Sequence, residues 1–270
     1  MENCKMRISV LMGVYNAEKT LREALESIFN QTYQDFELII CDDGSTDSSL
    51  DILTKYSHRF PNKIKLIIHD VNKGLNETLN DCLNIAKGEY IARMDADDIS
   101  LPMRFQKQVE FLDSNPEFAF VGTNMIHFDD SGDWGISTLI KIPQKKDMVK
   151  GSSFSHPSIL MRRSALLQVG GYTVSPRLLR VEDYHLWIKM YEYGFYGYNL
   201  REPLIKFRDD KDAQARRTIS NRLNEIYVKH LAIHKLKLPI YNYVYIMKPL
   251  LLILVPASLY KLLHQFKLKR

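Results

Sequence analysis

The strongest constraint on the fold is a repeated alternation between short apolar runs and longer amphipathic segments through the first 121 residues. The runs are too short for buried helices and too continuously apolar for strands with one solvated face. Each run therefore predicts a strand that is covered on both sides. We place these strands at residues 8–12, 36–41, 64–69, 90–94 and 118–121.

The segments between these runs carry apolar residues at helical spacing, as in Leu21, Ala24, Leu25 and Ile28. We expect Asn16 to cap the first helix, Gly88 to follow the third, and Ser100 with Pro102 to start the fourth. The resulting β-α-β-α-β-α-β-α-β order predicts an α/β fold. Its Rossmann-like sheet should be mainly parallel, with helices on both faces.

The second half of the chain is less regular. Its pattern predicts a hairpin or long loop at 125–142, a short strand at 158–161 and a short helix at 164–169. It then predicts a longer helix at 182–193, a final strand at 204–207 and a charged helical segment at 213–237. The 270 residues suit one large α/β domain, or one such domain with a short appendage.

Charge is distributed unevenly along the chain. The net charge is +5 and the first half is rich in aspartate, whereas residues 261–270 contain lysine and arginine and no acid. This balance suits a phosphorylated ligand or an anionic membrane face, and we expect no nucleic-acid partner. The three cysteines form no CxxC pattern, and the polar first residues show no signal peptide. Both features predict a cytoplasmic protein with reduced thiols.

Three carboxylates lie within the four residues Asp95-Ala96-Asp97-Asp98, directly after the fourth predicted strand. Carboxylates this close repel one another, and a divalent cation removes that cost. Mg²⁺ and Mn²⁺ prefer oxygen ligands, and open α/β sheets bind ligands at the carboxyl ends of their strands. The cluster predicts a metal site at Asp95 and Asp97, with Asp98 as a helix cap. A polar capping loop without metal is the alternative.

Asp42 and Asp43 follow the second predicted strand in a loop rich in turn residues. Two acids at a buried strand end need a donor such as a base N–H or a ribose hydroxyl. Tyr15, just past the first strand, either stacks on a base or packs in the core. Lys73 and Arg93 lie near strand ends, where each meets phosphate or solvent.

Glu182 and Asp183 open a predicted helix. Acids in a first helical turn interact favourably with the helix dipole, which explains the pair without catalysis. Alternatively, a carboxylate at a pocket mouth takes the proton from an attacking hydroxyl. His156 is either a packed residue or a site residue, and Arg208 either holds phosphate or pairs with a nearby acid.

Five stretches, in this order and spacing, resemble family-2 glycosyltransferases of the GT-A fold. They are VLMGVYN at 10–16, FELIICDDGSTD at 36–47, GEYIARMDADD at 88–98, SHPS at 155–158 and EDYHLW at 182–187. The chain is most similar to bacterial enzymes of exopolysaccharide or capsular polysaccharide biosynthesis, through residues 197–200 and 208–210.

The resemblance implies a role for each matching residue. It assigns nucleotide-sugar contacts to Val14, Tyr15, Glu18, Asp42, Asp43, Arg93, Asp95, Ala96 and Asp97. Mg²⁺ or Mn²⁺ would bind Asp95 and Asp97, with Asp97 as the main contact. Asp183 is the implied catalytic base and Glu182 its support. The acceptor side is implied at His156, Trp187 and Arg208.

The implied reaction is an inverting single displacement, in which an acceptor hydroxyl, deprotonated by Asp183, attacks the anomeric carbon opposite the leaving diphosphate. The implied donor is a UDP-sugar that gives a hexose or N-acetylhexosamine, and the implied acceptor is a saccharide, lipid-linked, in extracellular polysaccharide biosynthesis. His185 stands where the family often has an acid, so acceptor contacts differ here. The Gln-x-x-Arg-Trp motif of processive members is incomplete at residues 214–217, so we expect one sugar per encounter.

These roles divide the chain into a GT-A catalytic domain at 1–210 and a helical, membrane-associating extension at 211–270. Within the domain, 1–122 is the nucleotide-sugar half and 123–210 the acceptor half. Residues 249–260 are apolar but too short to span a bilayer. They either pack on the catalytic domain or lie at the cytoplasmic membrane face, where the basic residues 261–270 would meet anionic lipid.

Two other functions fit parts of the pattern. A nucleotidyltransferase uses a similar sheet and metal chemistry, but residues 14–18 lack the Gly-rich basic loop expected there. A non-catalytic binding or regulatory protein on this scaffold would be suggested by loss of Asp97 or Asp183, and both are present.

Overall fold

The computed structural model of the protein describes residues 6–209 and 218–253. Its centre is one sheet in the order β3-β2-β1-β4-β8-β6-β9-β5, with β7 paired to β6. The strands are β1 (Ile8–Val14), β2 (Phe36–Asp42), β3 (Ile64–Ile68), β4 (Tyr90–Arg93), β5 (Ile99–Ser100), β6 (Phe118–Asp129), β7 (Gly132–Ser137), β8 (Leu160–Arg162) and β9 (Tyr196–Arg208).

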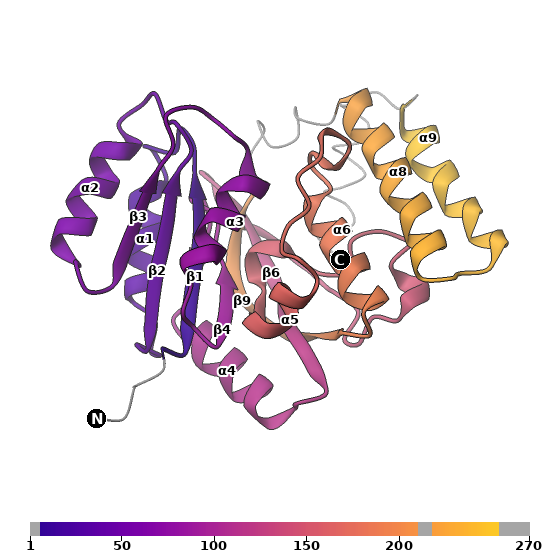
Figure 1. Ribbon diagram of the computed structural model, residues 1–270, viewed down its shortest axis with the longest axis horizontal. Helices are drawn as coiled ribbons and strands as arrows, with labels where there is room; N and C mark the ends of the chain where they lie inside the picture. Colours follow the sequence, from indigo (N-terminus) through magenta and orange to yellow (C-terminus); the bar gives the residue numbers. More distant parts are fainter. Residues whose placement is uncertain (1–5, 210–217, 254–270) are drawn as a thin grey trace.

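Helices cover both faces of this sheet, as predicted. Their bounds are α1 (Leu21–Phe29), α2 (Ser49–Arg59), α3 (Leu75–Ile85), α4 (Arg104–Ser114), α5 (Arg163–Gln168), α6 (Glu182–Glu192), α8 (Ile219–Lys235) and α9 (Met247–Ile253). One core cluster contains residues of α1, α2 and α4, and the other contains residues of α3, α5 and α6. In Figure 1, β1 to β3 lie at one end of the molecule and α8 and α9 at the other.

The strands of the first half alternate their side chains between these two clusters. Val10 and Met12 of β1 belong to the cluster with α1, whereas Leu11 between them belongs to the cluster with α3. All three are at most 1% exposed. Burial of such a side chain stabilises a fold by about 1.5–3 kcal/mol, so a continuous apolar run is stable only between two helical layers.

The four strands at one end of the sheet are parallel, but the whole sheet is mixed. β1 pairs in parallel with β2 and β4, and β2 with β3. β8 then lies between β4 and β6 and runs antiparallel to both. β6 and β9 are parallel to each other, and β7 folds back on β6 as the predicted hairpin. One sheet thus runs through both predicted halves, and their boundary near residue 122 stays a prediction.

Three predicted helix boundaries are wrong. The N-cap of α1 is Thr20, because Asn16 has φ 50° and its side chain accepts the Thr46 N–H instead. α3 ends at Ile85, and Gly88 instead allows close backbone contact, since a Cβ there would lie 2.4 Å from the Ser9 nitrogen. Ser100 belongs to β5, and α4 begins only at Arg104.

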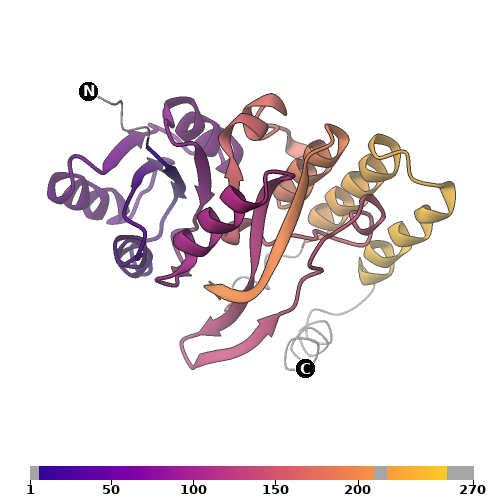
Figure 2. The ribbon, with the colours of Figure 1, turned by 90° about the horizontal axis from the view of Figure 1, so that it is seen from below.

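The C-terminal part of the described chain is helical. α8 packs against α6, and the 3₁₀ helix η4 (Ile240–Ile246) and α9 pack against α8. Figure 2 shows these orange and yellow helices at the end of the molecule opposite the indigo and purple N-terminal strands. Residues 210–217 and 254–270, with Gln214, Arg216, Pro256 and the basic end of the chain, lie outside the described residues. No helix within residues 6–209 and 218–253 combines the length and hydrophobicity that crossing a bilayer requires.

Candidate active site

The parallel strands bring three predicted segments to one edge of the sheet. Tyr15 follows β1, Asp43 follows β2, and Asp95 comes two residues after the end of β4. Because the carboxyl ends of parallel neighbours lie side by side, segments far apart in the sequence meet here. Two cavities open along this edge. We call them the Asp43 cavity and the Asp183 cavity.

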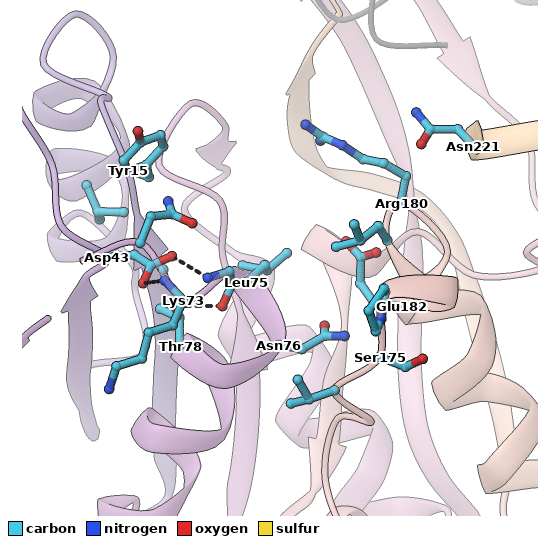
Figure 3. A pocket seen from close by; sticks show the side chains of 17 residues that line it. Tyr15, Asp43, Lys73, Leu75, Asn76, Thr78, Ser175, Arg180, Glu182 and Asn221 are labelled. Atoms are coloured by element: carbon cyan, nitrogen blue, oxygen red, sulfur yellow. Dashed lines mark hydrogen bonds between the residues drawn. The ribbon is translucent and has the colours of Figure 1, made fainter. Parts of the chain in front are cut away.

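The Asp43 cavity has a volume of about 620 Å³. One wall contains Val14, Tyr15, Asp43 and residues 72–76, and the facing wall contains residues 174–176, 179, 180 and 182. Figure 3 shows the two walls, with the Arg180 side chain pointing across the gap toward the wall that carries Tyr15. Tyr15 is 51% exposed. It is therefore a surface ring at the rim and does not pack in the core.

Asp43 is a buried carboxylate held by three described donors. Its Oδ1 accepts hydrogen bonds from the His69 ring at 2.8 Å and from the Lys73 backbone N–H at 2.9 Å. Its Oδ2 accepts the Gly74 N–H at 2.9 Å. Burial alone would raise the pKa of Asp43, but these hydrogen bonds outweigh it and the pKa is lowered. Asp43 is therefore ionised at neutral pH.

Asp42 behaves differently from its neighbour. Its Oδ2 accepts the Ser45 N–H at 3.1 Å, as in an Asx turn. It is 1% exposed and does not line the Asp43 cavity. The turn accounts for Oδ2 of Asp42, whereas its buried Oδ1 has no hydrogen-bond partner among the described residues. Asp43 is the acid of the pair that lines the cavity.

The acidic cluster after β4 brings carboxylates of Asp95, Asp97 and Asp98 together. One oxygen of each lies within 4.8 Å of the others. Asp95 forms an ion pair with Arg93, a fully buried residue, and the Asp97 carbonyl accepts a hydrogen bond from Arg208 Nε at 3.3 Å. The cluster has the hard oxygen donors and the spacing that Mg²⁺ or Mn²⁺ requires.

The prediction that Asp98 caps a helix is wrong. Asp98 is fully buried, and its Oδ1 accepts the Arg208 backbone N–H at 2.9 Å, while α4 begins only at Arg104. Its Oδ2 has no hydrogen-bond partner among the described residues. Burial, with the charges of Asp95 and Asp97, raises the pKa of Asp98 well above its ordinary value. An unpartnered buried carboxylate oxygen beside two other acids favours a cation at this position.

The Asp183 cavity, of about 530 Å³, joins this cluster to the start of α6. Asp95, Asp97, Asp183 and Arg208 all line it, and Arg180 and Asn221 line both cavities. Asp183 Oδ2 accepts a hydrogen bond from Ser152 Oγ at 3.2 Å. Burial, with the neighbouring Glu182, raises the pKa of Asp183 to about 7. A carboxylate with this pKa can take up a proton near neutral pH.

Glu182 and Arg180 lie beside Asp183 and face the Asp43 cavity. Burial raises the pKa of Glu182. Arg180 has φ 67°, a conformation that non-glycine residues rarely adopt, and it brings its side chain to the border of both cavities. Arg208 closes the other side, where its guanidinium pairs with Glu23 and Asp130, both at 3.2 Å.

Some predicted site residues lie outside both cavities. Glu18 accepts the Ser48 backbone N–H at 3.0 Å near the start of α2. Ala96 is buried, and its carbonyl accepts from Thr20 Oγ1. Trp187 is fully buried and stacks on Phe120 at 5.1 Å between ring centroids.

His156 and Arg93 are also enclosed. Burial and nearby Arg93 lower the pKa of His156 well below its ordinary value, and its Nε2 lies 2.9 Å from the Tyr172 hydroxyl. Arg93 is 2% exposed and reaches Asp95. It therefore acts on the acidic cluster from within the core and not from a cavity wall.

Sequence patterns did not single out several residues of the two cavities. Ser152 and Asn76 are ordinary loop and helix residues in the sequence, and their position depends on tertiary packing. The first turns of α8 add Asn221, Arg222 and Glu225 from beyond the predicted catalytic domain. Only Arg180 carried a signal, because it directly precedes the Val181-Glu182-Asp183 segment.

Comparisons with known sequences agree with this geometry. A protein-family model described as glycosyl transferase family 2 matches residues 9–180. EpsE of Bacillus subtilis is 43% identical over 263 residues, which cover 97% of this chain and 95% of that protein. The amylovoran biosynthesis glycosyltransferase AmsE of Erwinia amylovora is 30% identical, over 85% of each chain. A UDP-Gal:alpha-D-GlcNAc-diphosphoundecaprenol beta-1,3-galactosyltransferase of Escherichia coli is 32% identical, over 78% of this chain and 77% of that protein.

Solved structures agree on the fold. TarS of S. aureus in complex with UDP-GlcNAc has a TM-score of 0.64 at 20% identity, over 86% of this chain and 70% of that one. The mannosyltransferase PcManGT of Pyrobaculum calidifontis, in complex with GDP-Man and Mn²⁺, has a TM-score of 0.64 at 17% identity, over 97% and 80%. The predicted GT-A architecture is confirmed, with a mixed sheet. From the family model and the 43% identity along almost its whole length, the chain belongs to glycosyltransferase family 2.

Proposed function

We propose that this glycosyltransferase moves one hexose or N-acetylhexosamine from a UDP-sugar to a saccharide hydroxyl, in an inverting and metal-dependent reaction. The observation that carries the proposal is that the two cavities are adjacent. Arg180 and Asn221 line both, so a ligand bound near Asp43 reaches toward the acidic cluster and Asp183. One molecule with a base, a diphosphate and a sugar has the extent that this arrangement requires.

The Asp43 cavity suits the nucleoside. Tyr15 offers an exposed ring at the rim, and Asp43 offers an anionic oxygen that suits a base N–H. Uracil and thymine carry such an N–H in an imide, and guanine carries one in a lactam. TarS was crystallised with UDP-GlcNAc and the E. coli relative is named for UDP-Gal, and both names favour uracil.

The acidic cluster suits the diphosphate with Mg²⁺ or Mn²⁺. Asp97 and Asp95 would hold the cation from the cavity side, and the unpartnered Oδ2 of Asp98 lies in the same cluster. The cation would offset the negative charge that develops on the leaving diphosphate. Arg93 holds Asp95 from inside the core, and Arg208 adds a positive charge at the cavity wall.

Asp183 is the proposed base. It lines the same cavity as Asp95 and Asp97, and its pKa of about 7 lets it accept a proton from an acceptor hydroxyl near neutral pH. The deprotonated oxygen then attacks the anomeric carbon on the face opposite the diphosphate, which inverts the configuration. Ser152 orients the Asp183 carboxylate through its hydrogen bond, and the neighbouring Glu182 helps to raise the pKa of Asp183.

The acceptor is proposed to be a lipid-linked saccharide of extracellular polysaccharide biosynthesis. The name of the E. coli relative contains a diphosphoundecaprenol acceptor, and that of AmsE contains amylovoran biosynthesis. The Asp183 cavity carries Arg180, Arg222 and Arg208, which suit an acceptor that brings phosphate with it.

An anionic membrane at the cytoplasmic face is the proposed location of that acceptor. η4 and α9 present apolar side chains that are each more than half exposed, namely Ile240, Tyr241, Val244, Met247 and Leu251. Interfacial helices bury such side chains among lipid headgroups. The basic residues that follow in the sequence would add attraction to anionic lipid.

A donor panel tests this function. Purified protein is incubated with UDP-, GDP- and dTDP-sugars, Mn²⁺ or Mg²⁺, and a lipid-diphosphate saccharide, and the released nucleotide is identified. We expect release of UDP with a new glycosidic bond of inverted configuration by NMR. Release of pyrophosphate would indicate a nucleotidyltransferase, and retained configuration would refute the single displacement. Asp97→Ala and Asp183→Asn should each lower turnover at least about 100-fold, and unchanged turnover would remove that residue from the mechanism.

A further inference from the structure

His69 lies between two carboxylates from different elements. It follows β3 directly and is 6% exposed. Its Nδ1 is 2.8 Å from Asp43 Oδ1 and its Nε2 is 2.9 Å from Asp81 Oδ2. Asp81 belongs to α3, and its side chain is 41% exposed. The chain Asp43–His69–Asp81 thus connects the wall of the Asp43 cavity to a surface helix.

The two distances define the protonation state that fits this geometry. Carboxylates only accept, so both ring nitrogens must donate, and only the imidazolium has two N–H groups. In a neutral ring, one nitrogen lone pair would face a carboxylate. The pKa of His69 is raised, because the hydrogen bonds to Asp43 and Asp81 outweigh the burial that would lower it.

Other titratable groups near His69 come from β2, α3 and the loop before α3. Cys41 Sγ of β2 lies 3.4 Å from Nε2, and Cys82 of α3 is a buried thiol beside Cys41. The charge of Lys73 opposes protonation of His69. The two carboxylates are closer to the ring than either thiol sulfur, so they dominate its charge state.

Asp43 depends on this ring for its orientation. A carboxylate offers about four acceptor positions, and His69, Lys73 N–H and Gly74 N–H occupy three of them. Two of the three donors are on Oδ1, which leaves one position on Oδ2 for a ligand. Without the ring, Asp43 could rotate or take up a proton, and the ligand position would be lost.

We propose that His69 is a positioning residue for the donor: as an imidazolium anchored to Asp81, it holds Asp43 anionic and oriented so that one lone pair of Oδ2 can accept the imide N–H of the nucleobase. This inference rests on the proposed nucleotide-sugar function. It adds that three hydrogen-bonded residues, Asp43, His69 and Asp81, control donor affinity, and that the last two act from outside the cavity. Donor affinity is highest while His69 is protonated and falls as the pH rises through its titration.

Calorimetric binding of UDP in the presence of Mg²⁺, from about pH 6 to about pH 9, tests the inference. His69→Gln should raise the Kd of UDP about ten-fold near neutral pH and remove the His69-dependent step, while kcat at saturating donor changes less. Asp81→Asn should move the step to lower pH, because one of the two carboxylates that stabilise the imidazolium is gone. The matched control is His58→Gln, which changes an exposed histidine of α2 outside both cavities and should keep the wild-type profile.

The differences between variants decide the outcome, because titration of UDP itself is common to all of them. If His69→Gln and Asp81→Asn both bind UDP with wild-type affinity and both keep the pH-dependent step of UDP binding at the wild-type pH, the inference is overturned. The proposed function would still stand. If His69→Gln does not fold, Asp81→Asn decides the outcome, because Asp81 is partly exposed and asparagine has the same shape as aspartate. A pH-dependent step of UDP binding that stays at the wild-type pH in Asp81→Asn then overturns the inference but not the proposed function. If the wild type neither binds a nucleoside diphosphate nor releases one from a donor, the proposed function fails first, and the inference fails with it.

Discussion

Replacement of Asp183 by asparagine should lower catalysis and, at alkaline pH, stabilise the fold. The reason is the raised pKa, about 7 against an ordinary value of 3.8. Between these values the native protein binds a proton that the unfolded chain does not bind. Wild-type stability therefore falls as the pH rises through this window, and the loss is complete above pH 7. Asparagine does not ionise, so the variant escapes this loss.

The size of the effect follows from the shift. A difference of about three pKa units corresponds to at most about 4 kcal/mol, at about 1.4 kcal/mol per unit. Asp183 borders a cavity and is only partly buried, so solvent screens its charge. We therefore expect the variant to gain about 1–2 kcal/mol at pH 8 relative to pH 5. The Ser152 hydroxyl can still donate to the asparagine carbonyl, so the local geometry should persist.

Denaturant unfolding of both proteins at several pH values, with a chelator and without donor, measures this difference. Other groups titrate in the same range, but they are common to both proteins and cancel in the comparison. Glu117→Gln, at an exposed position between α4 and β6, is the control and should change stability by less than about 0.5 kcal/mol at every pH. The reasoning is refuted if the difference in unfolding free energy between Asp183→Asn and the wild type does not grow from pH 5 to pH 8.

Three further predictions follow from the same geometry. Because Asp183 must be ionised to act as a base, kcat at saturating donor should rise about ten-fold per pH unit below pH 7 and level off above it, and a flat profile would contradict the assignment. Trp187→Ala should cost about 3–5 kcal/mol of stability and Trp187→Phe clearly less, while the KM of the folded variants for the acceptor stays unchanged, because Trp187 lies in the core. A raised acceptor KM in Trp187→Phe would instead support the predicted acceptor contact. The double substitution Ile240→Glu with Val244→Glu should weaken binding to anionic vesicles at least about ten-fold in co-sedimentation, whereas Ile136→Glu, at an exposed position of β7, should not. Wild-type binding by the double variant would argue against docking through η4.

The sequence was most informative where hydrophobicity alone determines structure. The runs that became β1, β2 and β4 are apolar because both faces of each strand are covered, and this local pattern needs no knowledge of strand partners. The run that became β3 was expected to be covered in the same way, but β3 is the edge strand and is only partly buried. β8 was predicted as a short strand, but not its place between β4 and β6 or its antiparallel direction. That place depends on long-range pairing, which periodicity does not encode.

The candidate site shows the same division between local and tertiary information. The sequence predicted Asp43, Asp95, Asp97 and Asp183 as site residues because acids next to buried strands or at a helix start are visible in it, and the structure places all four on cavity walls. Their roles stay predictions. The burial of Asp98 could not be predicted from the sequence, because it depends on β9, which brings the Arg208 backbone N–H to this carboxylate. Burial of Trp187 was not visible either, because this residue lies close in sequence to Glu182 and Asp183 but is fully buried in the core.

Burial explains why these residues act together. A carboxylate in water has a pKa near 4 whatever its neighbours in sequence. Here three acids of similar intrinsic acidity differ in pKa because their surroundings differ. The pKa of Asp43 is lowered by three donors that outweigh its burial, that of Asp98 is raised by burial and by two like charges, and that of Asp183 is raised to about 7 by burial and by Glu182. These directions suit the proposed roles of Asp43 as an anionic ligand acceptor, of Asp98 as part of a cation-binding cluster and of Asp183 as a base. One edge of the sheet can hold all three proposed roles, because its parallel strands bring the acids close to one another. Separate loops give each acid different neighbours and so a different pKa.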